Sequence, residues 1–279
     1  MLAWLGFGRK SVEERLAEVL GDRELPSFPA VVLDALSALR DPDASLRAVG
    51  SRLCADPGIS VQVLRLTNSA ALGLRNPVSS VEQAACLIGR AQLESLLLGV
   101  GVSRLVAPAA SRSGLDAKGF WRAAARRASA ARALAARLHP ATKSECFTAA
   151  LLSDLAVPLL ADAKGEIYAR MLREQREGGA DLHALERGEF GWDHGTIGGA
   201  LGAQWNLPEL LSRSIHAHHE DADDLPPALH LASLLADEPQ EEERFVEVAA
   251  SRFGVPTDEA AATLEHAGVE AGSIAACFA

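Results

Sequence analysis

The sequence predicts an all-α protein built from two packed helical bundles. Apolar residues recur at intervals of three and four along most of the 279 residues, which is the spacing of one face of an α-helix. Alternating runs rich in Val, Ile and Thr, which would indicate strands, are scarce. Capping residues and short stretches with Gly or Pro punctuate the pattern, and such short connections favour antiparallel neighbouring helices.

Six helices are expected in the first part of the chain, with glycines and prolines as stops between them. The predicted starts lie near Ser11, Ala30, Ser45, Ile59, Ser80 and Gln92, and the predicted stops are Gly21, Pro42, Pro57, Gly73 and Pro77. Ser45 and Ser80 each place a hydroxyl oxygen ahead of an apolar helical pattern. Such an oxygen can accept a hydrogen bond from an unpaired amide of the first turn.

The composition changes after Leu105. Residues 107–114 are small, polar and interrupted by Pro and Gly, which predicts a boundary between two helical halves. The halves are expected to span residues 11–110 and 115–279. An alanine-rich helix is then predicted from Phe120 to Leu138, and its small side chains would let neighbouring helices approach closely. We therefore expect this helix to be central and buried.

Composition also narrows the class of function. There are 27 Lys and Arg residues against 37 Asp and Glu, a formal charge of −10, which opposes non-specific binding to nucleic acid or anionic lipid. No apolar run approaches the roughly 20 residues that span a bilayer, so membrane insertion is not expected. The four cysteines are scattered without a CxxC pair, which favours reduced thiols in a cytoplasmic protein.

Short motifs in a fixed order carry a family resemblance. They are LPSFP at 25–29, LRLTNSA at 64–70, NPVSSVEQA at 76–84, FWR at 120–122, LLSD at 151–154, GWDH at 191–194, WNLP at 205–208 and IHAHH at 215–219. This series resembles the HDOD domain, a bacterial output module related to the HD-type metal-dependent phosphohydrolases, and the resemblance extends from about Leu25 to Asp237. It implies an N-terminal helical bundle packed on a degenerate HD-type bundle, and a role in signal transduction rather than turnover.

The resemblance also implies an incomplete HD-type centre on a predicted helix segment over residues 151–157. Ser153 stands ahead of Asp154, where the HD signature has a metal-binding histidine. Ala123 and Val157 stand where the family's first histidine and a frequent lysine are expected. Because a metal-dependent hydrolase needs several imidazoles and a carboxylate around its metal, we expect no catalytic residue, no cofactor and no metal.

Five residues remain where a vestigial site could hold a metal or ligand: Asp154, His194, His216, His218 and His219. For Asp154 the favoured interpretation is a buried acceptor between helices, with metal binding as the alternative. His194 is expected to be partly exposed at the start of a helix that runs to Trp205 and is capped by Asp193. The three later histidines are expected at the end of a helix over 210–219, where imidazoles can satisfy terminal carbonyls.

Three functions stay open. The leading hypothesis is a non-catalytic regulatory module that binds a signalling protein, and the absence of a receiver or kinase domain in the sequence suggests that it acts in trans. The first alternative is a residual metal-dependent phosphohydrolase acting on a nucleotide or cyclic dinucleotide. The second is a sensor that binds a small molecule in the ancestral cavity. The N-terminus carries an apolar tip formed by Leu2, Trp4, Leu5 and Phe7. This tip could dock on a partner, although the favoured interpretation is that it folds back onto its own domain.

Overall fold

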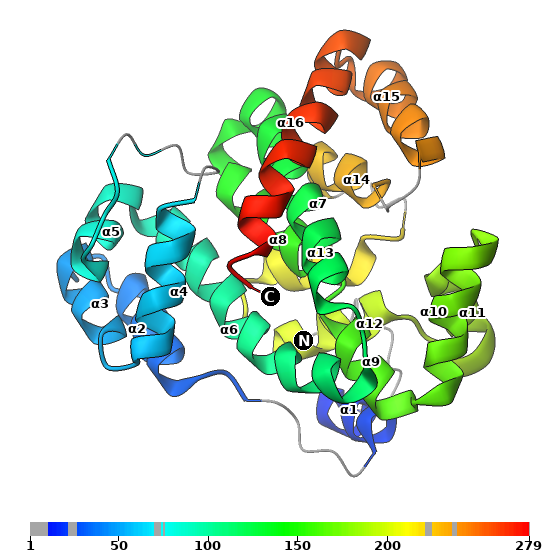
Figure 1. Cartoon of the computed structure of the whole chain (residues 1–279), viewed down its shortest axis with the longest axis horizontal. Helices are drawn as coiled ribbons and strands as arrows, with labels where there is room; N and C mark the ends of the chain where they lie inside the picture. The colour runs from blue at the N-terminus through cyan, green and yellow to red at the C-terminus, as the bar shows by residue number, and fades with distance from the viewer. Residues whose placement is uncertain are drawn as a thin grey trace.

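The computed structural model describes residues 11–21, 27–69, 74, 76–220, 225–235 and 239–278, and its regular elements within these ranges are all helices. This confirms the predicted all-α class. The apolar tip at residues 2–7 lies outside the described residues. Figure 1 shows the helices α2–α5 gathered at one end of the molecule and joined to the remainder by the long helix α6.

The first six helices are close to those predicted. Their bounds are α1 Val12–Leu20, α2 Ala30–Arg40, α3 Leu46–Leu53, α4 Pro57–Thr67, α5 Val81–Ile88 and α6 Arg90–Ser113. The side chains of Ser11, Ser45 and Ser80 accept the expected amide hydrogen bonds at three helix starts. Pro57 was predicted to stop a helix but begins α4, because Asp56 caps the helix and a proline at its first position loses no hydrogen bond.

Residues 107–113 are helical, so the change in composition after Leu105 does not mark a break in the helix. They form the last turns of α6, which contains Pro108 and ends only at Gly114, where φ is +68°. Val106, Ala109 and Ala110 are buried, and α6 packs against α9. This tertiary packing outweighs the local breaker signal. The division into residues 11–110 and 115–279 stays a prediction.

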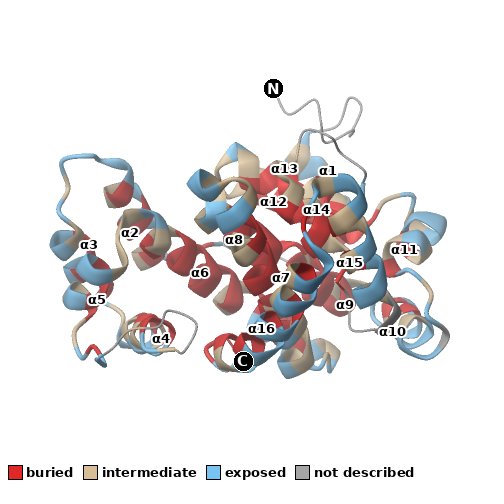
Figure 2. Ribbon diagram, turned by 90° about the horizontal axis from the view of Figure 1, so that it is seen from above, coloured by how far each residue is buried: buried red, intermediate tan, exposed pale blue. Residues whose placement is uncertain are grey.

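The remaining helices surround α7. Their bounds are α7 Ala117–Leu138, α8 Lys143–Leu152, α9 Ala156–Lys164, α10 Glu166–Gly178, α11 Leu182–Phe190, α12 His194–Gln204, α13 Glu209–Ala217, α14 Pro227–Ser233, α15 Pro239–Phe253 and α16 Thr257–Ala275. The helix α7 packs against α8, α14 and α16, and Figure 2 shows it at the buried centre. Because Ala124, Ala128, Ala131 and Ala135 are all buried, the expectation of a central alanine-rich helix is confirmed.

Two segments are long and apolar enough to cross a membrane by composition alone, Arg90–Ser113 and Pro140–Lys164, which differs from the sequence-based expectation. Their most apolar windows are 72% and 83% buried inside the fold. The second segment is also interrupted by a turn at residues 153–155. Both segments therefore pack as core helices. All four cysteines are free thiols.

The contact between α3 and α5 offers a test of packing. A Cβ atom added at Gly50 would lie 2.7 Å from the backbone Cα of Glu82, which cannot rotate away. We expect Gly50→Ala to lower the free energy of unfolding by about 1–3 kcal/mol, the usual cost of overpacking. The measurement is urea-induced unfolding followed by circular dichroism.

The matched control is Gly268→Ala on α16. A Cβ there meets nothing within 4 Å, so alanine should raise the free energy of unfolding by about 0.5–1 kcal/mol through its lower backbone entropy in the unfolded chain. Equal shifts of the same sign in the two variants would contradict the packing argument.

Candidate functional site

Asp154 lies in the turn between α8 and α9 rather than within a helix. The turn is held by backbone hydrogen bonds from Leu155 to Leu152 and from Val157 to Asp154. The hydroxyl of Ser153 donates to the Ala149 carbonyl at 3.0 Å. The serine that replaces the family histidine thus satisfies the end of α8, and the carboxylate that follows it faces the neighbouring helices.

His194 occupies the first position of α12, and Asp193 caps this helix as predicted. The expectation that His194 is partly exposed is wrong, because the residue is only 2% exposed. The cause is Glu186 on α11, which is fully buried. One Glu186 oxygen accepts from the His194 backbone amide at 2.8 Å and faces its ring Nδ1 at 2.7 Å, and the other accepts from the hydroxyl of Tyr168.

The end of α13 carries the remaining histidines. His218 Nδ1 lies 2.7 Å from the Ile215 carbonyl oxygen, which confirms the expected satisfaction of a terminal carbonyl. His216 lies apart from the other histidines and packs against α12, where a Cβ added at Gly199 would lie 2.6 Å from the His216 Cβ. This close approach of α12 and α13 brings His218 and His219 beside His194.

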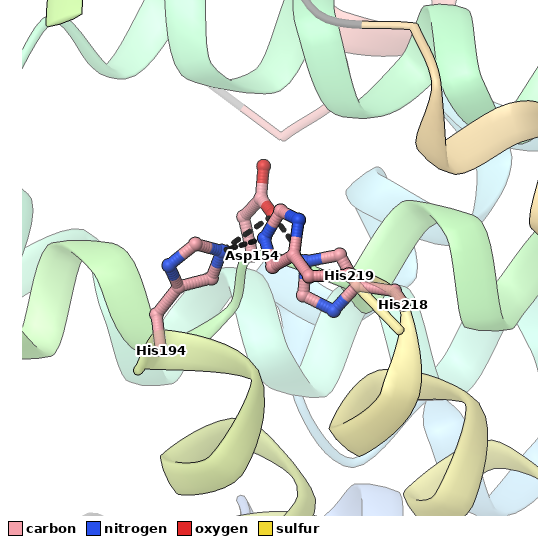
Figure 3. A group of neighbouring side chains, drawn as sticks. All are labelled: Asp154, His194, His218 and His219. Carbon is pink, nitrogen blue, oxygen red and sulfur yellow. Dashed lines mark hydrogen bonds and ion pairs between the residues drawn. The ribbon is translucent and has the colours of Figure 1, made fainter. Parts of the chain in front are cut away.

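Four of the five predicted positions converge: Asp154, His194, His218 and His219, named here the His/Asp cluster (Figure 3). Their ligand atoms all lie within 4.8 Å of one another. Asp154 Oδ1 lies 3.4 Å from His194 Nε2 and 3.3 Å from His218 Nε2. His219 Nε2 lies 2.8 Å from His194 Nε2, and its ring stacks on that of His183 with centroids 4.3 Å apart.

A guanidinium completes the charge balance of the cluster. Arg127 on α7 forms an ion pair with Asp154 Oδ2, which leaves Oδ1 facing the imidazoles. Burial opposes ionisation of Asp154, but Arg127 and His194 outweigh it and hold the pKa of this carboxyl well below its usual value. Asp154 is therefore a carboxylate at neutral pH.

The histidines divide into proton donors and acceptors. Burial opposes a charge on His194, but Glu186 and Asp154 outweigh it and raise the pKa of this imidazole to about 10. Burial and the neighbouring His218 and His194 lower the pKa of His219. At neutral pH a charged His194 can thus donate through Nδ1 to Glu186 and through Nε2 to a neutral His219.

His218 turns its second ring nitrogen toward the carboxylate. Because a carbonyl oxygen only accepts, Nδ1 carries a proton that it donates to the Ile215 carbonyl. The buried Nε2 lies 3.3 Å from Asp154 Oδ1 and makes no hydrogen bond of normal geometry with the described residues. A positive charge shared by these two atoms, carried by a proton or by a metal ion, stabilises the contact.

The donor set fits one divalent transition-metal ion. Three imidazole nitrogens and one carboxylate oxygen are zinc-type ligands, and the separations of 3.3 and 3.4 Å match the edge of about 3.3 Å expected of a tetrahedron around such an ion. The 2.8 Å between His194 Nε2 and His219 Nε2 is shorter than such an edge, so these two rings would move apart around an ion. The contacts of His194 with Glu186 and of His218 with Ile215 have the form that orients metal-binding imidazoles. Asp154, His194, His218 and His219 would hold the ion.

The cavity that borders His218 is small. It is lined also by Ser153, Ser214 and Leu229, includes no other member of the His/Asp cluster and measures about 10 Å³, which is room for about one water molecule. The four donors are all protein side chains, which is the pattern of a closed structural site, whereas catalytic zinc sites keep a position for water or substrate.

Four functional neighbours were missed by sequence reasoning: Arg127, Tyr168, His183 and Glu186. They lie on three different helices, at separations of 8 to 36 residues from the residues they contact. A charged residue on the buried alanine face of α7 was the one available signal, because an arginine at such a position needs a partner.

The all-helical fold and the His/Asp cluster define a protein of the HD-type class. Within that class the chain belongs to the HDOD family, since its sequence matches the HDOD domain over residues 25–221.

One relative is similar over most of this chain. An uncharacterized protein of Treponema pallidum is 27% identical over 208 residues, a match that covers 74% of this chain but only 40% of that protein. This chain thus spans less than half of the relative's length.

Solved structures share the fold. A Shewanella amazonensis protein provisionally named a phosphohydrolase has 22% identity and a TM-score of 0.77, and a Geobacter sulfurreducens HDOD domain protein of unknown function has 23% identity and a TM-score of 0.73. Both comparisons cover 96% of this chain and 98% of the other. A Marinobacter aquaeolei protein provisionally named a signal transduction protein has 18% identity and a TM-score of 0.74, over 96% of this chain and 65% of that one.

The contact between Glu186 and His194 predicts a pH dependence of stability in chelator-treated protein. Because the pKa of His194 is raised from 6.5 to about 10, the stabilisation from its charge is fully present below about pH 6.5 and is lost as the pH rises through about 10. In Glu186→Gln the pKa of His194 should fall, so the loss should begin at lower pH. The measurement is the free energy of unfolding from pH 6 to 10.

The control is Tyr168→Phe, which removes the other hydrogen bond to Glu186 but keeps the carboxylate. We expect this variant to retain the wild-type midpoint of the pH dependence, even if it is less stable throughout. Parallel pH profiles for Glu186→Gln and wild type would show that Glu186 does not hold the charge on His194.

Proposed function

We propose that this HDOD protein is a non-catalytic signal-transduction module of the cytoplasm that acts by binding another signalling protein. The observation that carries this proposal is that the donor atoms of the His/Asp cluster already face protein groups. Arg127 pairs with the outer oxygen of Asp154, and the adjoining cavity of about 10 Å³ has no room for a nucleotide.

The electrostatics of the cluster support the same proposal. The inner oxygen of Asp154 faces His194 and His218, and His194 is in turn held by Glu186. Each donor atom therefore already faces another protein group, so a substrate would have to displace these contacts. Such a cluster is suited to tie α8, α12 and α13 together rather than to turn over a substrate.

A residual metal-dependent phosphohydrolase is the second candidate, and the convergence of three imidazoles on a carboxylate favours it. A bound divalent ion would supply Lewis acidity and lower the pKa of a coordinated water. The residues of this chain would orient the ion through Glu186 and the Ile215 carbonyl. The same lack of space argues against a small-molecule sensor at this position.

The distinguishing experiment measures metal and turnover together. Protein purified without an affinity tag or chelator is assayed for metal per chain by elemental mass spectrometry, and metal-loaded protein is incubated with nucleotides and cyclic dinucleotides. We expect wild type and Asp154→Ala to release product at the same background rate, because the closed cluster offers no position for substrate.

The control variant is Arg122→Ala, which removes an exposed arginine of α7 and should behave as wild type. Arg127→Ala tests the closure itself, and it should remain inactive if the centre lacks catalytic groups. Metal-dependent hydrolysis that is abolished by Asp154→Ala and retained in Arg122→Ala would overturn the non-catalytic proposal in favour of the phosphohydrolase.

The partner is sought separately, by affinity capture with the intact chain and with a version that begins at Ser11. A regulatory module should retain its captured signalling protein in Asp154→Ala, since binding does not need hydrolysis, and the purified pair should re-form a complex of fixed stoichiometry. A comparison with the shortened chain reports whether residues 1–10 contribute. Failure of every captured protein to re-form a complex with the purified chain would argue against the binding role.

A further inference from the structure

A cavity of about 260 Å³ lies between α4, α6, α7, α8 and α16 and shares no lining residue with the His/Asp cluster. Its walls are mostly apolar and include Leu96, Phe147, Ile274 and Phe278. Figure 1 shows α16 running beside α7 over this part of the molecule. The cavity thus joins helices from the first part of the chain to helices from the second.

The cavity exists because α7 presents small side chains to it. Ala133 and Ala136 line it where larger residues would fill it. An apolar cavity of about 150 Å³ is known to accept benzene, so a cavity of 260 Å³ suits an apolar body of roughly ten non-hydrogen atoms. Its volume approaches the lower end of the range of small-molecule sites.

Two charged side chains in the cavity wall, Glu270 and Arg132, form an ion pair with each other. Glu270, whose side chain is 8% exposed, accepts two hydrogen bonds from Arg132 Nη2 at 3.0 and 2.8 Å and one from Ser129. The guanidinium of Arg132 also lies over the ring of Phe147, 5.2 Å from its centroid. The negative charge of Glu270 is therefore compensated within the wall, and Arg132 is held in one place.

Two further polar side chains at the cavity have no partner among the described residues. Lys143, the first residue of α8, is exposed, and Gln92 of α6 is half-buried. Both line the cavity. With Glu270 balanced by Arg132, Lys143 leaves one positive charge in excess, and the N-terminus of α8 adds to the positive potential there. The vacant donors thus favour an anion.

We propose that this cavity binds a small organic acid with an apolar, preferably aromatic, body of roughly ten non-hydrogen atoms and a single carboxylate. The body lies among Leu96, Phe147 and Ile274, and the carboxylate meets Lys143 at the mouth. This site is separate from the His/Asp cluster and goes beyond the proposed signalling role, because it adds an input to the module. A bound acid contacts α4 and α6 together with α7, α8 and α16.

The test uses two probes that differ in charge, 4-phenylbutyrate and 4-phenylbutan-1-ol, with the full chain labelled at isoleucine methyl groups for NMR. Ile274 lines the cavity, whereas Ile215 lies beside the His/Asp cluster, so the two methyl signals distinguish the two places. We expect the acid to shift Ile274 and leave Ile215 unchanged, with a Kd near 1 mM or tighter for a ligand of this size.

Charge recognition is tested with Lys143→Gln. An exposed ion pair accounts for about a two- to fivefold change in affinity, so this variant should bind the acid two- to fivefold more weakly and bind the alcohol unchanged. The matched control is Lys118→Gln, an exposed lysine of α7 outside the cavity. It should bind both probes as wild type does.

Occupancy of the cavity is tested with Ala136→Leu, which places a larger side chain in the wall at an exposed helical position. It should abolish the Ile274 shift while the protein stays folded. The control Ala262→Leu, at an exposed position of α16 outside the cavity, should leave that shift in place.

The proposal is overturned if the acid at 10 mM leaves Ile274 unshifted, if Ile215 shifts instead, if Lys143→Gln binds the acid as tightly as wild type, or if Ala136→Leu still binds the acid.

Discussion

The ion pair between Arg127 and Asp154 is the interaction on which the arrangement of the second part of the chain depends. Asp154 is a carboxylate enclosed by helices, and an enclosed charge is tolerated only when it is paired and hydrogen-bonded. Arg127 reaches it from α7, and His194 and His218 reach it from α12 and the end of α13. One carboxylate therefore fixes the relative positions of three helices and of the turn that joins α8 to α9.

The fold could be predicted from the sequence wherever local chemistry decides the backbone. The serine caps at Ser45 and Ser80 and the alanine face of α7 correctly predicted three helices. Local signals gave the wrong backbone at two places, Pro108, which lies inside a helix, and Asp154, which lies in a turn. Pro108 itself is exposed, but its neighbours Ala109 and Ala110 are buried and α6 packs against α9, and the turn at Asp154 is stabilised by contacts with distant helices. Both outcomes depend on tertiary packing, which spacing along the chain does not reveal.

The site was predicted in its residues but not in its chemistry. The positions of Asp154, His194, His218 and His219 followed from the motifs, and the structure joins them into one cluster. What sequence reasoning missed is the set of groups that assign their charge states. Glu186 keeps His194 charged and Arg127 keeps Asp154 ionised. Neither residue forms a recognisable sequence motif with the residue that it contacts. Charge states in a buried cluster are properties of the assembled fold.

The continuity of α6 has a mechanical consequence. Its 24 residues form a rod of about 36 Å, and it contacts α2, α4 and α5 as well as α8 and α9. Near its C-terminal end Arg112 is clamped to Asp162 of α9 at 2.8 Å. A continuous helix can carry tilt and rotation along its length, except where Pro108 removes a backbone hydrogen bond. A displacement of the first helices would thus be felt at α9, the helix that follows the turn of Asp154.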